Sequence, residues 1–157
     1  MGTLPLTAAI SAEVAWHVAR CLEVEVASDV AGVREADHAE TNPQAKELVC
    51  VPLACSLVGQ QHPVLIEAGT LAARLYQVVE TVEPFFCSFG VNLSYQGALE
   101  QAGMSFTGFD KNREPHILEL PKHRFFLAAL YVPQAAHTQT RPPPLLVGFV
   151  AACQRRS

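Results

Sequence analysis

Two apolar segments near the carboxyl end form the clearest hydrophobic pattern of the chain. Residues 125–132 are apolar without interruption and precede Pro133, which cannot donate to a strand ladder, so the pattern predicts a buried strand. Three prolines at 142–144 then precede a terminal helix, whose apolar positions are Leu145, Leu146, Phe149, Val150 and Cys153. This order places residues 132–134 at the carboxyl end of a strand, where open α/β sheets hold their functional groups.

The rest of the chain is predicted to alternate between strands and short helices. Strands are predicted at 48–58 (with Pro52 forcing an edge or a break), 63–66, 78–92, 104–109 and 116–120. Helices are predicted at 7–27 and at 94–101, the second stopped by Gly103, and residues 71–76 fit either a helical turn or a strand. Polar residues predict a loop at 33–43 and a hairpin turn at 110–114.

Composition and charge restrict the classes of partner. The 157 residues suit one domain, and half of them are hydrophobic. A net charge of −4 argues against nucleic acid or an anionic membrane as the partner, because phosphate binding needs clustered Lys and Arg. The apolar runs are shorter than the ~20 residues that span a bilayer, and no basic segment precedes the first apolar residues. We therefore expect a cytoplasmic protein that spans no membrane.

The cysteines predict no metal site, and one polar cluster leaves two interpretations open. The five cysteines lack CxxC spacing, which favours reduced thiols over disulfides or a zinc site; they are Cys21, Cys50, Cys55, Cys87 and Cys153. Asp37, His38 and Glu40 concentrate imidazole and carboxylate within a short segment, which suits a proton-transfer or metal cluster. A solvated turn ended by Pro43 is the commoner structure for such a segment.

Several short motifs, in order and with consistent gaps, carry a resemblance to a known family. They are residues 89–92, 99–110, 117–126 and 141–152, with 36–43 and 52–58 as further matches. The chain resembles class I glutamine amidotransferase domains, most closely those of CTP synthase and the CTP synthase C-terminal region-related proteins, over about 24–153. The resemblance implies one partial domain over 1–157, with 1–23 outside the match. Its expected fold is a flavodoxin-like α/β three-layer sandwich, a mixed sheet with helices on both faces, missing its N-terminal strands.

The resemblance also assigns residues to the family's catalytic positions. The family uses a Cys nucleophile, a His base and a Glu that orients the His. Trp16 stands at the nucleophile position, Val132 at the base and Gln134 at the orienter, and none of these side chains can do that chemistry. Phe86 and Ser88 replace the His and Arg of relatives, and with Tyr131 they would line a vestigial pocket. We therefore expect a catalytically degenerate domain that binds no glutamine-like ligand and no cofactor.

Alternative interpretations of the sequence belong to other classes. An active or partner-complemented glutamine amidotransferase, supplying ammonia for CTP-type nucleotide synthesis, would need Cys55 or Cys21 to meet His38 at hydrogen-bond distance. A fragment without independent function is a third interpretation. The start of the chain fits either a truncated or shifted reading frame or a natural remnant. A remnant would leave a sheet edge open to pair with another chain or a second copy.

Overall fold

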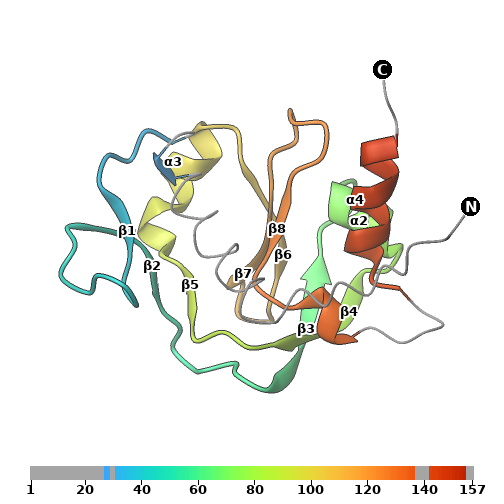
Figure 1. The fold of residues 1–157 in the computed structure, drawn as a ribbon, viewed down its shortest axis with the longest axis horizontal. Coiled ribbons are helices and arrows are strands. Elements are labelled where there is room, and N and C mark those ends of the chain that lie inside the picture. Colours follow the sequence, from blue (N-terminus) through green and yellow to red (C-terminus); the bar gives the residue numbers. More distant parts are fainter. Residues whose placement is uncertain (1–26, 29–30, 137–141, 155–157) are drawn as a thin grey trace, which may run out of the picture.

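The computed structural model describes residues 27–28, 31–136 and 142–154, and its elements form two sheets with helices on either side (Figure 1). Trp16, Cys21 and nearly all of the helix predicted at 7–27 lie outside the described residues. Among the described helices, none is long and apolar enough to cross a membrane.

The larger sheet has five antiparallel strands. In sheet order they are β4 (Glu80–Phe85), β3 (Gln60–Ile66), β6 (Ser105–Phe109), β7 (Pro115–Glu119) and β8 (Leu127–Ala129). The predicted strands at 63–66, 104–109 and 116–120 correspond to β3, β6 and β7. The predicted turn at 110–114 joins β6 to β7, where the Asp110 side chain accepts hydrogen bonds from the N–H groups of Asn112 and Glu114.

The smaller sheet is mixed and contains one strand that the sequence pattern does not predict. β2 (Glu47–Pro52) lies between β1 (Ala36–His38), which runs parallel to it, and β5 (Phe89–Val91), which runs antiparallel. The expectation of a loop throughout 33–43 is therefore wrong, because pairing with β2 makes Ala36–His38 a strand. The strand predicted at 78–92 is divided into β4 and β5, which belong to different sheets.

The helices are mostly short, and a side-chain cap is present at some of their N-termini. Residues 71–76, undecided from the sequence, form α2 (Leu71–Tyr76), in which the Thr70 hydroxyl accepts a hydrogen bond from the Ala73 N–H. A 3₁₀ turn, η1 (Leu93–Tyr95), leads into α3 (Gln96–Gln101), which ends before Gly103 at a φ of 96°. The remaining two are η2 (Pro133–Ala136) and α4 (Pro144–Gln154).

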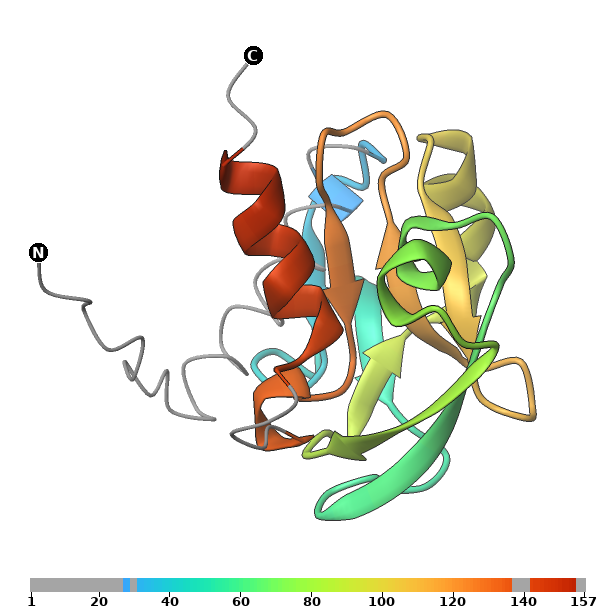
Figure 2. The ribbon, with the colours of Figure 1, turned by 90° about the vertical axis from the view of Figure 1, so that its right-hand side faces the viewer.

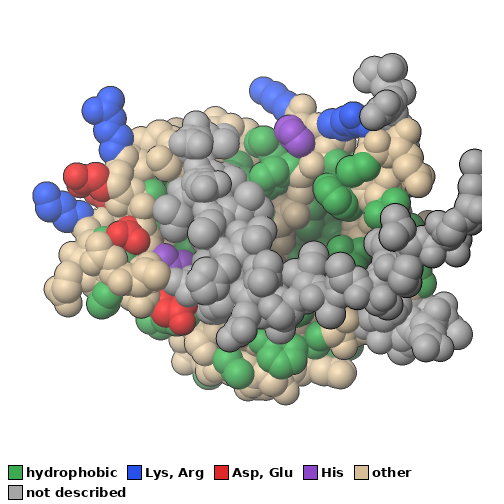
Figure 3. Space-filling view, in the orientation of Figure 1, with side chains coloured by type: hydrophobic (Ala, Val, Ile, Leu, Met, Phe, Trp, Pro, Cys, Tyr) green, Lys and Arg blue, Asp and Glu red, His purple; other side chains and the backbone are tan. Residues whose placement is uncertain are grey.

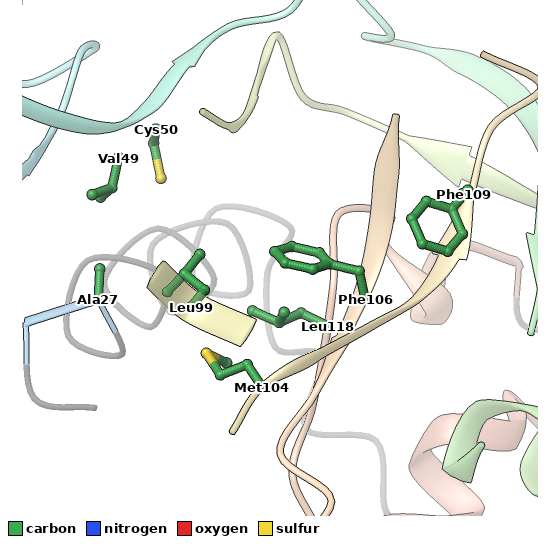
Figure 4. Close-up of a cluster of buried hydrophobic side chains, with 8 residues drawn as sticks. All are labelled: Ala27, Val49, Cys50, Leu99, Met104, Phe106, Phe109 and Leu118. Carbon is green, nitrogen blue, oxygen red and sulfur yellow. The ribbon is translucent and has the colours of Figure 1, made fainter. Parts of the chain in front are cut away.

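The two faces of the larger sheet pack against different layers. On one face, α2 and α4 cover a cluster that contains Val64, Phe85 and Ile117 (Figure 2). On the other face, the smaller sheet and α3 enclose a second cluster, in which Cys50, Leu99 and Phe106 meet (Figure 4). The expected α/β class with helices on both sides is confirmed, and its strands are shared between two sheets.

The apolar run at 125–132 is only partly a strand. Only Leu127–Ala129 form β8, which is half-buried because it pairs with β7 alone at the sheet edge. Tyr131 and Val132 are buried beyond the end of the strand. The prediction of a continuous buried strand is therefore wrong. The run begins as an edge strand and continues as a buried segment without strand structure, which is hydrogen-bonded to β4.

The terminal helix α4 is confirmed, but it buries little of its apolar stripe. Leu145 is buried, and Gly148 lies against Leu75 of α2. The other large apolar side chains of α4 are exposed; they are Leu146, Val147, Phe149 and Val150. Figure 3 shows hydrophobic side chains on the surface around this helix. A helix that is apolar on most sides can bury only the side that faces its neighbour.

A substitution at Gly108 would test the close contact between β6 and β7. A Cβ atom on Gly108 would lie 2.5 Å from Cγ1 of Ile117 and 2.8 Å from its Cβ. Ile117 is buried in the cluster under α2 and α4, so it cannot move aside. We expect Gly108→Ala to lower the free energy of unfolding by about 1–3 kcal/mol, as measured by urea denaturation. Gly97→Ala in α3 meets nothing within 4 Å and serves as the control. Equal losses in both variants would contradict this packing.

Candidate functional site

The segment that follows β8 carries the position assigned to the catalytic base. Val132 is 8% exposed, and its N–H donates to the carbonyl oxygen of Pro84 at 2.9 Å. The Tyr131 hydroxyl beside it donates to the hydroxyl of Tyr76 at 2.9 Å. Burial raises the pKa of Tyr131 well above its usual value, so this hydroxyl stays neutral. The segment is thus fixed to β4 and α2 by groups that do not exchange protons near neutral pH.

The other positions that the resemblance assigns lie around the carboxyl end of β4. Gln134 is half-buried in η2, which packs against β4. Phe86 follows β4 and is 45% exposed. The hydroxyl of Ser88 lies 2.8 Å from that of Ser56. The structure therefore brings Val132 to the same strand end that carries Phe86 and Ser88. This arrangement can pack and form hydrogen bonds, but these side chains offer no general base.

The loop at 53–59 runs alongside residues 85–88 and forms one wall of this region. Its backbone N–H groups donate to carbonyl oxygens opposite, from Leu53 to Ser88 at 2.8 Å and from Gly59 to Phe85 at 2.9 Å. The loop carries Cys55, which is exposed.

Asp37, His38 and Glu40 lie in one segment, where the Asp37 carboxylate and Nδ1 of His38 accept hydrogen bonds from neighbouring residues. The Asp37 carboxylate accepts from the His38 N–H at 2.7 Å and from Nδ2 of Asn42 at 2.8 Å. The backbone hydrogen bond, followed by that from Asn42, lowers the pKa of Asp37. Nδ1 of His38 accepts from the Glu40 N–H at 3.1 Å. His38 is buried against Phe89, with ring centroids 5.0 Å apart, so the expectation of a fully solvated turn is wrong here.

The structure places a different cysteine beside His38 from the ones the sequence suggests. The strand register sets Cys50 opposite His38, and Cys50 is fully buried. Cys55 lies in the loop that leaves β2, and Cys21 lies outside the described residues. None of the four cysteines at 50, 55, 87 and 153 forms a disulfide. Within the described ranges, no group of three His, Cys, Asp or Glu side chains could hold a metal ion.

Sequence reasoning missed a set of buried polar residues in the larger sheet. Glu119 is 3% exposed, and its carboxyl oxygens accept hydrogen bonds from the N–H groups of Leu71 and Ala72 at 2.9 and 2.7 Å. The Thr107 hydroxyl donates to the same group at 2.9 Å. His116 and Glu83 are buried as well. The signal available in the sequence was a charged residue within the apolar run at 117–120, which indicates a buried, fully bonded carboxyl group.

Comparison with known proteins gives the fold and the relatives of this chain. No protein-family model matches it. In structure it is similar to the CTPS glutaminase domain of Trypanosoma brucei with bound acivicin, at a TM-score of 0.80 and 24% identity, over 88% of this chain and 58% of that one. The chain therefore has an α/β fold like that of part of this glutaminase domain.

Curated relatives identify the branch more closely. The CTP synthase of Pyrobaculum calidifontis is 36% identical over 145 residues, which make up 85% of this chain and 27% of that protein. The CTP synthase of Saccharolobus solfataricus is 32% identical over 139 residues, or 82% and 26% of the two chains. The chain is thus a relative of the CTP synthases through their glutaminase part, which confirms the resemblance. It spans about a quarter of the length of these relatives.

Proposed function

We propose that this chain is a catalytically degenerate glutaminase domain of the CTP synthase type, which does not hydrolyse glutamine. The observation that carries the proposal is the environment of Val132. The sequence resemblance assigns its side chain to the family's base position, and its backbone N–H donates to the carbonyl oxygen of Pro84 in a buried segment. A valine cannot take a proton from a thiol, and Gln134 cannot stabilise an imidazolium.

The surroundings support the same conclusion. Phe86 and Ser88 give this strand end an apolar and a neutral hydrogen-bonding side chain in place of charged groups. Cys50, the cysteine in register with His38, is enclosed in the core, where a dissolved substrate cannot reach its sulfur. Such a domain could still bind another chain. The exposed side chains of Val58, Val82 and Phe86 would make the apolar contacts.

A glutaminase assay on the full chain tests the proposal. We expect no glutamate release above the buffer rate, because loss of the base alone removes about 10²–10⁴-fold in rate. Cys55→Ala and His38→Gln should match the wild type, with Cys153→Ala as a control at another exposed thiol. Turnover that disappears in Cys55→Ala and persists in Cys153→Ala would overturn the proposal and favour an active amidotransferase.

A further inference from the structure

Three imidazole nitrogens are buried in the core on the α2 and α4 side without a hydrogen-bond partner. Both ring nitrogens of His116 and Nδ1 of His62 have none within the part of the chain that the structure describes. His116, in β7, is only 3% exposed. Burying an unpaired polar group lowers the stability of the fold, and burying an unpaired charge lowers it far more. Protonation of the His116 ring would therefore destabilise the packing around it.

Phe85 lies between the two histidines and links them to the same apolar cluster. Its ring centroid is 4.8 Å from that of His116 and 6.3 Å from that of His62. Tyr131 packs edge-on against the same ring at 5.7 Å. Phe85 is completely buried, so a charge on His116 would lie against a ring that water does not reach.

The acidic groups that face this cluster are already bound elsewhere. Asp110, in the turn after β6, accepts from the N–H groups of Asn112 and Glu114 at 2.8 and 2.7 Å. Burial and then Asp110 raise the pKa of Glu114. Glu83, paired with His62 across β3 and β4, accepts from the Thr81 hydroxyl at 2.9 Å.

Two tyrosines, Tyr76 of α2 and Tyr131, also belong to this cluster or pack against it. Burial raises the pKa of both hydroxyls, so they stay neutral. Among the described residues, Asp110 is thus the acidic group whose charge favours a proton on the His116 ring, and the effect of burial outweighs it.

We propose that His116, with His62 beside the same phenylalanine, makes this core layer acid-sensitive, so that proton uptake by His116 opens the packing of the larger sheet against α2 and α4. Burial, opposed by Asp110 and aided by His62, lowers the pKa of His116 to about 4. A folded-state pKa below the unfolded value of 6.5 means that the unfolded chain binds more protons between these values. The stability is therefore fully present above pH 6.5 and is lost as the pH falls towards 4.

Urea unfolding of the full chain between pH 7 and pH 4 tests the proposal. The wild-type unfolding constant should rise by roughly 100-fold between these two pH values, as follows from a pKa of 6.5 in the unfolded chain and about 4 in the folded one. His116→Phe should lose most of this rise, and His123→Gln, at an exposed histidine, should keep it. An unchanged pH dependence in His116→Phe would overturn the proposal.

Proton NMR of the wild type provides a test that does not depend on a variant folding. The C2 proton of His116 should report a neutral ring for as long as the chain stays folded. Titration of this ring near pH 6.5 in the folded chain would show that its protonation is tolerated, and the proposal would fail.

Discussion

Glu119→Ala is expected to lower the free energy of unfolding by about 3–5 kcal/mol, because it leaves buried donors without an acceptor. The carboxyl group of Glu119 accepts from the N–H groups of Leu71 and Ala72 and from the Thr107 hydroxyl. It therefore holds the first turn of α2 on the larger sheet. Urea denaturation followed by circular dichroism measures the loss.

A surface glutamate provides the control for this loss. Glu100 in α3 is exposed and accepts one hydrogen bond from Gln96, so Glu100→Ala should change the free energy of unfolding by no more than about 0.5 kcal/mol. Glu119→Gln keeps one acceptor oxygen and should fall between the two. A Glu119→Ala variant as stable as Glu100→Ala would show that α2 does not depend on this anchor.

Phe85→Ala alone should lower the free energy of unfolding by about 3–5 kcal/mol, because it opens a cavity in the core under α2 and α4. Phe85 is completely buried and touches the rings of His62, His116 and Tyr131. Small shifts cannot fill the space, since its neighbours Val64 and Ile117 lie on strands that are held in the sheet.

The adjacent residue supplies a matched control of the same type. Phe86 is 45% exposed, so Phe86→Ala should cost no more than about 1 kcal/mol. Thermal unfolding of both variants at one pH separates burial from the general effect of removing a phenylalanine. Similar melting temperatures for the two variants would contradict the placement of Phe85 in the core.

The sequence predicts well those elements whose signals are local. The turn at 110–114 is set by the Asp110 side chain, which accepts the N–H groups of the residues that follow it. Gly103 ends α3 because its φ of 96° favours a residue without a side chain. In both places the residue type and the backbone conformation determine each other without help from distant parts of the chain.

Elements that depend on pairing between distant residues were not predictable in the same way. Ala36–His38 becomes a strand because β2 lies beside it, and residues 78–92 alternate evenly although they belong to two sheets.

The candidate site was likewise predictable only in part. The resemblance assigned Val132 and Gln134 to catalytic positions, but the contact of Val132 with Pro84 depends on how β8 and β4 lie in the sheet. The burial of His116 follows from β7 being covered on both faces.

The loop at 53–59 and the linker at 86–88 have a consequence for how the molecule folds. β2 pairs with β5, β3 pairs with β4, and the two connections are hydrogen-bonded to each other between these pairs. Residues 47–66 and 80–91 therefore form one long two-stranded ribbon, closed by α2, that passes from one sheet into the other. The two sheets therefore unfold together as one cooperative unit. Neither sheet can separate from the other unless the hydrogen bonds along this ribbon break. Phe86 and Ser88 lie in the linker between its two halves.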